Sequence, residues 1–458
     1  MSTDLIGQVV ADARRAFDSG GTRSYEWRLG QLRALHTMIE DNSDVILAAL
    51  KADLGKPMFE AWAAEIGVAL RDLKETMRAL KGWMKPEKVS TPLVTQPGSS
   101  RLYKDPLGVV LIIAPWNYPF NLVITPLMGA IAAGNAAVIK PSEISSNTSK
   151  MIADLLPRYV DNDAIKVVEG AIPETTALLA ERFDHIFYTG NGHVARIIMA
   201  AAAKHLTPVT LELGGKSPVY INKSADLKTT ARRVAWGKFT NAGQTCIAPD
   251  YILVDGEIHD AFLEHLRAAI DGFYGRNPQQ TDSYARIVSD RHHQRLSRLL
   301  ANQDAVIGGQ ADPADRYIAP TVLQNVAPDS PVMCEEIFGP ILPVLSVDGI
   351  DAAIRFINGR DKPLALYVFT GDDDVAEAIL SRTSSGGATI NHVMLHYAVS
   401  SLPFGGVGES GMGAYHGQAS FDTFTHTKSV LKKPFMVDPS IMYPPYNETK
   451  EKWLRRLL

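Results

Sequence analysis

The chain has 458 residues, of which 46% are hydrophobic and 21% charged, and its 46 basic and 50 acidic side chains leave a formal net charge of −4. This composition is typical of a soluble globular protein with about three folding units, and it excludes disordered, collagen-like and coiled-coil chains. Because the charges nearly balance and no dense run of Lys and Arg occurs, we expect no nucleic-acid partner.

The chain contains only two cysteines, Cys246 and Cys334. Two thiols cannot form a disulfide framework and are too few for a zinc cluster, so we predict no metal site and a reducing compartment, the cytoplasm. The N-terminus lacks the apolar core of a signal peptide, and proline and glycine interrupt the apolar stretch at residues 122–139, which reads as a buried helix followed by a strand. We therefore expect no membrane anchor.

Residues 1–84 show the three- and four-residue apolar spacing of helices, above all at 24–42 and 57–84. Residues 86–106 place Pro and Gly at a turn between two alternating segments, which predicts a β-hairpin that extends from the core. The strand-like segment 429–436 is a candidate pairing partner for this hairpin.

From residue 107 onwards, short apolar runs alternate with helical segments. This alternation predicts parallel sheets covered by helices, with ligands at the carboxyl ends of the strands. The first sheet is expected to contain strands at residues 107–115, 136–139, 165–168, 184–188 and 208–213. A second α/β run begins near residue 218, with strands expected at 219–222, 251–254, 342–347, 364–370 and 388–391. We therefore predict two α/β lobes with a cleft between them.

The two cysteines differ in their surroundings. Cys246 lies on a glycine-containing turn at residues 241–246, where a thiol can be held at a cleft. Cys334 is followed by Glu335 and Glu336, whose charges disfavour the thiolate, which is the nucleophilic form. If one cysteine is catalytic, this charge argument favours Cys246. The alternative is that a lone cysteine is a small buried hydrophobe.

Two polar residues follow apolar strands. Glu212 ends the strand at 208–213 and precedes two glycines, where partial burial would raise its pKa toward that of a general base; a capping carboxylate is the alternative. Asn117 is the only amide in the loop PWNYP at 115–119, which suits an oxyanion-hole donor or, alternatively, a turn-stabilising residue.

Three further patterns bear on ligand binding. Lys140 and Glu143 close a strand in the segment KPSE, which suits a hydroxyl-rich or phosphorylated ligand but is also typical of a solvated surface. Residues 190–195 fit G-x-G-x-x-A, a dinucleotide fingerprint that is weak here because it follows the fourth strand rather than the first. His292 and His293 are interpreted as part of a solvated helix face rather than a metal site.

Taken together, the motifs resemble the aldehyde dehydrogenase superfamily over essentially the whole chain. They are PWNYP at 115–119, KPSE at 140–143, TGN at 189–191, LELGGKSP at 211–218, GQTC at 243–246, EEIFGP at 335–340 and PFGGVGESGMG at 403–413. The segments LGKP at 54–57, HLTPVTLELGGKSP at 205–218 and the tail at 443–457 resemble the class 3 branch, which includes coniferyl-aldehyde-type and fatty-aldehyde-type enzymes.

This resemblance implies an α/β fold of the aldehyde dehydrogenase type. A Rossmann-type NAD(P)-binding domain is expected at residues 1–84 and 105–210, and an α/β catalytic domain at 211–410. A β-hairpin element for bridging and oligomerisation is expected at 85–104 and 411–440, with a C-terminal tail at 441–458. Members of this branch are typically dimers, so a homodimer is expected.

The resemblance also assigns roles residue by residue. Cys246 matches the nucleophile, Glu212 the base that activates water, and Asn117 the oxyanion donor. The residues expected to contact the cofactor are Trp116, Lys140, Glu143, Gly190, Asn191, Glu336 and Phe338. Within this set, Lys140 matches a contact to the adenosine ribose, Glu336 one to the nicotinamide ribose, and Phe338 the ring beside the nicotinamide. Residues 192–195 depart from the pattern of many relatives, which leaves the pyrophosphate contacts open.

The implied activity is NAD(P)+-dependent oxidation of an aldehyde to the carboxylic acid through a cysteine thiohemiacetal and a thioester. Three alternatives remain open: an acylating enzyme that uses coenzyme A, a nucleotide-independent cysteine hydrolase, and a binding protein that keeps the fold. The charge of Glu143 would repel a 2′-phosphate and favours NAD over NADP as the cofactor. Aromatic, cinnamyl-type and aliphatic aldehydes all remain open as substrates.

Overall fold

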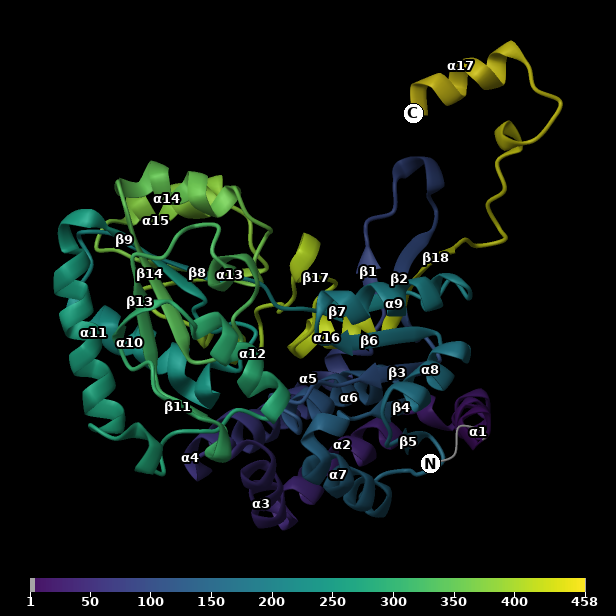
Figure 1. Cartoon of the computed structure of the whole chain (residues 1–458). Helices are drawn as coiled ribbons and strands as arrows, with labels where there is room; N and C mark the ends of the chain where they lie inside the picture. Colours follow the sequence, from purple (N-terminus) through teal and green to yellow (C-terminus); the bar gives the residue numbers. More distant parts are fainter. Residues whose placement is uncertain (1–4, 458) are drawn as a thin grey trace.

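The structure, a computed structural model, describes residues 5–457. It contains two α/β lobes, each built around its own sheet, and a smaller antiparallel sheet next to the first lobe (Figure 1). The two lobes predicted from the alternation of strands and helices are therefore confirmed.

The first lobe is built on a six-stranded sheet with the strand order β17-β7-β6-β3-β4-β5. Its strands are β3 (Val109–Ile113), β4 (Ala136–Lys140), β5 (Ile165–Val167), β6 (His185–Thr189), β7 (Val209–Glu212) and β17 (Gly411–Met412). All neighbouring strands are parallel except β17, which is antiparallel to β7. Every residue of β3, β4 and β6 is buried, as expected for apolar strands with both faces covered.

Ten helices belong to the part of the chain that forms this lobe. They are α1 (Ile6–Asp18), α2 (Tyr25–Asp41), α3 (Ser43–Leu54), α4 (Met58–Ala61), α5 (Val68–Trp83), α6 (Asn121–Ala133), α7 (Ser146–Tyr159), α8 (Ile172–Ala180), α9 (Gly192–Ala203) and α16 (Gly417–Thr423). A π-helical segment, Trp62–Gly67, joins α4 to α5. All residues of α6 are buried, so the apolar stretch 122–139 is a core helix followed by β4, as predicted.

The second lobe is built on a seven-stranded sheet with the order β10-β13-β14-β9-β8-β15-β16. Its strands are β8 (Pro218–Ile221), β9 (Tyr251–Asp255), β10 (Asp304–Ile307), β13 (Thr321–Gln324), β14 (Ile341–Val347), β15 (Ala365–Phe369) and β16 (Gly387–Ile390). Only β10 runs antiparallel to its neighbour. Five of these strands match the predicted ones, whereas β10 and β13 were not predicted.

The helices of the second lobe follow the strands as the α/β pattern requires. They are α10 (Leu227–Phe239), α11 (His259–Tyr274), α12 (Asp290–Leu300), α13 (Pro331–Cys334), α14 (Gly349–Asn358) and α15 (Asp373–Arg382). A two-stranded ribbon of β11 (Ala311–Asp312) and β12 (Tyr317–Ile318) lies in the same lobe. The carboxyl ends of β3, β4, β6 and β7, together with the turn after α10, supply most of the candidate site residues.

The third sheet has the order β1-β2-β18 and is antiparallel. Its strands are β1 (Glu87–Val89), β2 (Ser99–Pro106) and β18 (Thr425–Lys432). The predicted pairing of a late strand with the hairpin is confirmed, although this strand begins and ends earlier than the expected 429–436. The last helix, α17 (Glu448–Leu457), extends away from both lobes at the upper right of Figure 1.

Candidate active site

Cys246 follows a strained turn at the end of α10. The turn contains Asn241 and Ala242 with φ of 52° and 50°, and Gly243 with φ of 72°. A Cβ atom on Gly243 would lie 2.3 Å from the carbonyl oxygen of Gly339, so this position needs glycine both for its backbone conformation and for the close approach. Cys246 carries a free thiol, and the residue is half-buried at the end of this turn.

Three ionisable groups lie close enough to influence one another: Cys246, Glu212 and Glu336. Burial, together with the smaller effects of the carboxyl groups of Glu336 and Glu212, raises the pKa of the Cys246 thiol to about 12. The charge argument from the sequence is therefore wrong in one respect: Glu336 acts against the thiolate of Cys246, although it stands near Cys334 in the sequence. Cys334 lies exposed at the end of α13, where its thiol donates to the carbonyl oxygen of Asp329 over 3.3 Å.

Glu212 is the last residue of β7, at the carboxyl edge of the first sheet. Its side chain is 2% exposed, and neither carboxyl oxygen has a hydrogen-bond partner. Burial without compensating donors raises its pKa well above the ordinary value. A carboxyl group with these properties is a stronger base than an exposed one, and the alternative of a capping carboxylate does not fit because Glu212 accepts no N–H group.

Asn117 lies in the loop after β3 and is 3% exposed. Its side-chain amide donates to the carbonyl oxygen of Gln244 over 3.1 Å. The next residue, Tyr118, shares a hydrogen bond of 2.8 Å with the hydroxyl of Thr245. These two contacts hold the loop at 115–119 against the turn that carries Cys246.

Lys140 and Glu143 lie together at the end of β4. The ammonium group of Lys140 is buried and donates to the carbonyl oxygen of Pro141 over 2.7 Å and to the carboxylate of Glu143 over 3.2 Å. The side chain of Glu143 is 45% exposed. The carboxylate is therefore accessible to a ligand at this strand end, while Lys140 holds it in place.

Gly190 and Asn191 follow β6. The N–H group of Gly190 donates to the carbonyl oxygen of Glu212 over 3.0 Å, and a Cβ atom at Gly190 would lie 2.1 Å from the hydroxyl of Tyr188. The side-chain oxygen of Asn191 accepts the N–H group of Val194 and caps α9. The structure thus gives both residues a structural role at the start of α9.

Glu336 and Phe338 lie on the segment before β14. One oxygen of the Glu336 carboxyl group is buried and has no partner, and burial raises the pKa of this group to about 8. A Cβ atom on Gly214 would lie 2.2 Å from the Glu336 carboxyl group. The absence of a side chain at Gly214 therefore leaves room for this carboxyl group. Phe338 has a φ of 48°, and its ring contacts Trp116 edge-on at a centroid distance of 5.3 Å.

The interpretation of the histidine pair as a solvated face is wrong. His293 is 3% exposed, and its ring shares a hydrogen bond of 3.0 Å with the carbonyl oxygen of Tyr317. The His292 ring lies 4.8 Å from that of Trp116, and burial lowers its pKa to about 4. The helix α12 places one histidine in the core and the other beside the aromatic pair of Trp116 and Phe338.

The polar groups of the site fit a dinucleotide. The unpartnered oxygen of Glu336 can accept a hydroxyl group of a ribose, and the exposed carboxylate of Glu143 can do the same at the end of β4. Within residues 5–457, no group of three or more His, Cys, Asp and Glu side chains is placed to hold a metal ion. Over the same residues, no helix combines the length and apolar composition that crossing a bilayer requires.

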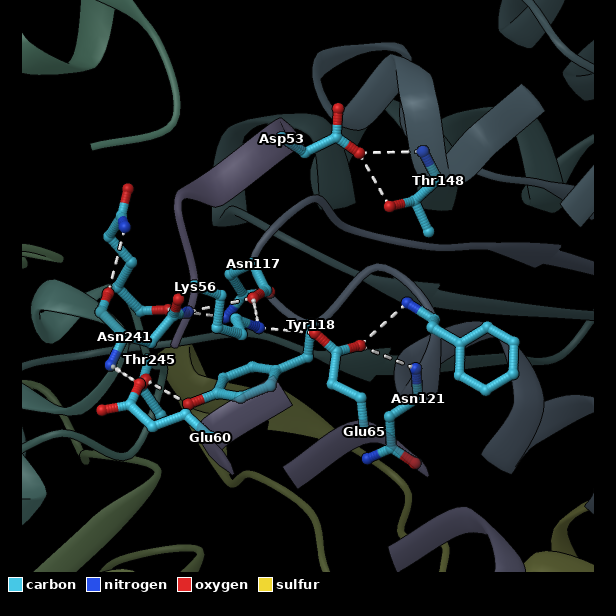
Figure 2. Close-up of polar contacts among 12 residues, drawn as sticks. Asp53, Lys56, Glu60, Glu65, Asn117, Tyr118, Asn121, Thr148, Asn241 and Thr245 are labelled. Atoms are coloured by element: carbon cyan, nitrogen blue, oxygen red, sulfur yellow. Dashed lines mark hydrogen bonds and ion pairs between the residues drawn. The ribbon is translucent and has the colours of Figure 1, made fainter. Parts of the chain in front are cut away.

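Several buried residues of the site were not predicted. Lys56 and Glu65 form an ion pair behind the loop at 115–119, and the side chain of Asn241 donates to the carbonyl oxygen of Asn117 (Figure 2). In the sequence, Lys56 stands in LGKP, which was interpreted only as a motif of the class 3 branch. No local pattern in the sequence marks this pair, because Lys56 lies between α3 and α4 and its partner Glu65 stands nine residues later.

Comparison with known proteins gives a consistent result. Residues 1–430 match the model of the aldehyde dehydrogenase family. The rat protein "Aldehyde dehydrogenase, dimeric NADP-preferring" is 51% identical over 442 residues, which cover 96% of this chain and 98% of the relative. The mouse protein "Aldehyde dehydrogenase family 3 member A2" is 50% identical over 451 residues, which cover 98% of this chain and 93% of the relative.

Solved structures agree with these sequence relatives. A substrate-bound state of Staphylococcus aureus AldH has a TM-score of 0.97 and 46% identity, covering 100% of this chain and 99% of that one. An indole-3-acetaldehyde dehydrogenase in complex with NAD+ has a TM-score of 0.86 and 28% identity, covering 94% of this chain and 89% of that one.

The chain belongs to the aldehyde dehydrogenase family, and the identity with family 3 members confirms the class 3 resemblance. It is an NAD(P)-dependent enzyme that oxidises an aldehyde to the carboxylic acid, on the fold predicted from its motifs.

Proposed function

We propose that Cys246 is the nucleophile of this reaction, Asn117 the oxyanion donor and Glu212 the base that activates water. One observation carries the proposal: the buried amide of Asn117 bonds to Gln244, two residues before Cys246. This contact holds the loop of Asn117 against the turn that carries Cys246, whose pKa both Glu212 and Glu336 raise. These contacts support the assignment of a nucleophile, a donor and a base to one site.

In the first half of the reaction, the Cys246 sulfur adds to the carbonyl carbon of the aldehyde. The carbon–oxygen double bond opens, and the negative charge moves to the oxygen, where the free N–H of the Asn117 amide and the backbone N–H of Cys246 stabilise it. When bound, NAD(P)+ supplies the hydride acceptor that turns the thiohemiacetal into a thioester. The high pKa of Cys246 keeps the thiol protonated until a neighbouring carboxylate takes its proton.

In the second half, Glu212 removes a proton from water, and the oxygen of this water adds to the thioester carbon. The carbon–sulfur bond then breaks with its electron pair going to sulfur, which releases the carboxylic acid, and the proton that Glu212 took from water returns Cys246 to the thiol. Glu212 suits this step because burial raises its pKa and leaves both carboxyl oxygens without a competing donor.

For the cofactor, we propose contacts from Glu336, Phe338 and Trp116 at the nicotinamide end, and from Lys140 and Glu143 at the adenosine end. Gly190 and Asn191 complete the proposed set between the two ends. We further propose that the enzyme accepts both NAD and NADP, with the carboxylate of Glu143 favouring NAD. The rat relative is described as NADP-preferring, so this charge effect is the point to test.

We also propose a homodimer, because the rat relative is described as dimeric. The proposed domains are the cofactor-binding domain at 1–84 and 105–210, the catalytic domain at 211–410, and the bridging element at 85–104 and 411–440. Of this last element, β18 joins the three-stranded sheet, whereas β17 pairs with β7 in the first sheet. The two free thiols suit the reducing conditions of the cytoplasm.

The nucleophile is tested with Cys246→Ser and, as the matched control, Cys334→Ser. We expect Cys246→Ser to lose at least about a thousandfold in NADH formation with an aromatic aldehyde, because an alcohol is far less readily ionised than a thiol. Cys334→Ser should keep full activity. Near-normal turnover of Cys246→Ser would exclude Cys246 as the nucleophile.

The base is tested with Glu212→Gln under single-turnover conditions. We expect about one equivalent of NADH per active site in the first turnover, followed by a block, because the thioester forms but water is no longer activated. Intact-mass spectrometry should show the acyl group on the protein, and Cys246→Ser/Glu212→Gln should not carry it. A normal steady-state rate in Glu212→Gln would assign the base elsewhere.

A further inference from the structure

Behind the loop at 115–119 lies a buried polar network that joins three segments far apart in the sequence (Figure 2). The first segment contains Lys56 and Glu65 near the N-terminus, the second contains Asn117, and the third contains Asn241 before Cys246. None of the proposed chemical steps uses Lys56, Glu65 or Asn241.

The ion pair of Lys56 and Glu65 lies in the interior, with exposed fractions of 1% and 0%. The ammonium nitrogen lies 2.5 Å from one carboxyl oxygen of Glu65. It also donates to the carbonyl oxygen of Asn117 over 3.0 Å and lies 4.2 Å from the centre of the Tyr118 ring. The free energy needed to remove two charges from water is about as large as the free energy gained from their attraction. Net stability alone therefore does not explain this pair.

The second carboxyl oxygen of Glu65 accepts two backbone N–H groups, from Phe120 over 3.0 Å and from Asn121 over 3.1 Å. These groups lie where the loop at 115–119 enters α6. Glu65 itself belongs to the π-helical segment Trp62–Gly67, and such segments are rare and often found at functional sites. Glu65 therefore holds the loop at its exit, while Lys56 holds it at Asn117.

Asn241 completes the network from the side of the nucleophile. Its side-chain amide donates to the carbonyl oxygen of Asn117 over 2.9 Å and to that of Gln244 over 3.1 Å. The carbonyl oxygen of Asn117 thus accepts a charged donor from Lys56 and a neutral donor from Asn241. Two donors from different directions fix the orientation of this peptide group, and with it the direction in which the Asn117 side chain leaves the backbone.

We propose that Lys56 and Glu65 are positioning residues for the oxyanion site: through the carbonyl oxygen of Asn117 and the N–H groups of residues 120 and 121, they hold the Asn117 amide against the turn of Cys246. The inference rests on the proposed role of Asn117. A buried ionic anchor suits this task because charged hydrogen bonds are short and directional, and a small displacement of the donor weakens stabilisation of the oxyanion.

The test uses the charge-neutral pair Lys56→Met/Glu65→Gln, which leaves no single buried charge behind. We expect the rate of the first-turnover NADH burst to fall by about 10- to 100-fold, less than the loss on removing an oxyanion donor outright. The KM for NAD should stay within about twofold of the unmodified enzyme, because the cofactor contacts are untouched.

The matched control is Asp53→Asn. Asp53 is a buried carboxylate near Lys56 in the sequence, and it accepts the N–H and hydroxyl groups of Thr148 rather than any group of the loop at 115–119 (Figure 2). We expect this variant to lower the unfolding temperature while leaving the burst rate unchanged. A comparable loss of burst rate in Asp53→Asn would mean that any disturbance of this core slows the reaction, and would overturn the proposal.

A double-mutant cycle with Asn117→Ala separates positioning from a general structural effect. If Lys56 and Glu65 act through Asn117, the pair variant should slow the burst by less than about twofold in the Asn117→Ala background. An equal loss in both backgrounds, or a normal burst in the pair variant, would overturn the positioning role. A normal burst in Asn117→Ala alone would instead refute the proposed role of Asn117 itself.

Discussion

The side-chain amide of Asn117 donates to the backbone carbonyl oxygen of Gln244 over 3.1 Å, and this bond joins the two lobes two residues before Cys246. Asn117 follows β3 of the first sheet, whereas Gln244 follows α10 of the second lobe. The proposed oxyanion donor and the proposed nucleophile therefore come from different lobes, and their relative position depends on the contact between these lobes.

The first prediction concerns the reactivity of Cys246 in the enzyme without cofactor. Because the pKa of the thiol is raised to about 12, we expect alkylation by iodoacetamide to speed up about tenfold per pH unit between pH 7 and 10, without a plateau. Glu336 has a pKa of about 8 and is therefore ionised at pH 9. At this pH, the Glu336→Gln variant should react faster than the unmodified enzyme, because a negative charge next to the thiol is removed.

Both measurements are made in a Cys334→Ser background, so that only one thiol reacts, and are read as loss of activity and gain of mass. An alkylation rate that levels off near pH 7 would show that the thiol is already ionised there. A slower reaction of Glu336→Gln would show that this carboxyl group does not oppose the thiolate.

The second prediction uses the space that Gly214 leaves for Glu336. In Gly214→Ala, the new methyl group would lie 2.2 Å from the Glu336 carboxyl group, which has to move. We expect the KM for NAD to rise about 10- to 150-fold, which corresponds to the loss of one hydrogen bond to a charged group. The unfolding temperature should change little, because the displaced atoms are the end of a flexible side chain.

Gly243→Ala is the contrasting variant. There the new methyl group meets the backbone carbonyl oxygen of Gly339 at 2.3 Å, and the φ of 72° strains any residue with a Cβ atom. We expect this variant to lose stability as well as activity. If Gly214→Ala bound NAD normally, the proposed contact of Glu336 with the cofactor would be wrong.

The third prediction addresses cofactor choice. In Glu143→Gln, we expect the ratio of kcat/KM for NADP over NAD to rise about tenfold, because one charge that repels a 2′-phosphate is removed at a half-exposed position. Asp154→Asn is the control, since Asp154 forms an exposed pair with Lys150 on α7. An unchanged ratio in Glu143→Gln would place the 2′-hydroxyl group away from Glu143.

Much of this molecule follows from local patterns in the sequence. The strands β3, β4 and β6 are continuous apolar runs because both of their faces are covered, and this makes them recognisable. Conversely, β10 (Asp304–Ile307) has two exposed residues and pairs only at the edge of its sheet, so its sequence carries little apolar signal. It was missed for this reason.

The residues of the candidate site likewise include some that the sequence predicts and some that it does not. Cys246, Glu212 and Asn117 stand at glycine turns or strand ends, where local sequence marks them. The effect of Glu336 on Cys246 depends on a distance across the fold, so the sequence suggested Cys334 as its neighbour instead. Lys56 and Glu65 were missed because the charge of each is compensated only by a partner in space, which no local pattern shows.

The last prediction concerns Glu60, whose carboxylate accepts the N–H group of Asn241 over 2.9 Å at the turn before Cys246. Burial raises the pKa of Glu60 to about 7 from an ordinary 4.5, outweighing the lowering by this hydrogen bond and by Lys56. Between these two values the folded protein holds a proton that the unfolded chain has lost. The stabilisation from this group is therefore complete below pH 4.5 and disappears as the pH rises through 7.

Glu60→Gln removes this titration but keeps an oxygen that can accept the N–H group of Asn241. Urea unfolding at pH 5 and pH 8 should show that the unmodified protein loses more stability across this range than the variant, and that the variant is the more stable of the two at pH 8. Other titrating groups contribute equally to both proteins and cancel in the comparison. An identical pH dependence of the two proteins would mean that Glu60 ionises normally and that its pKa is not raised in the folded state.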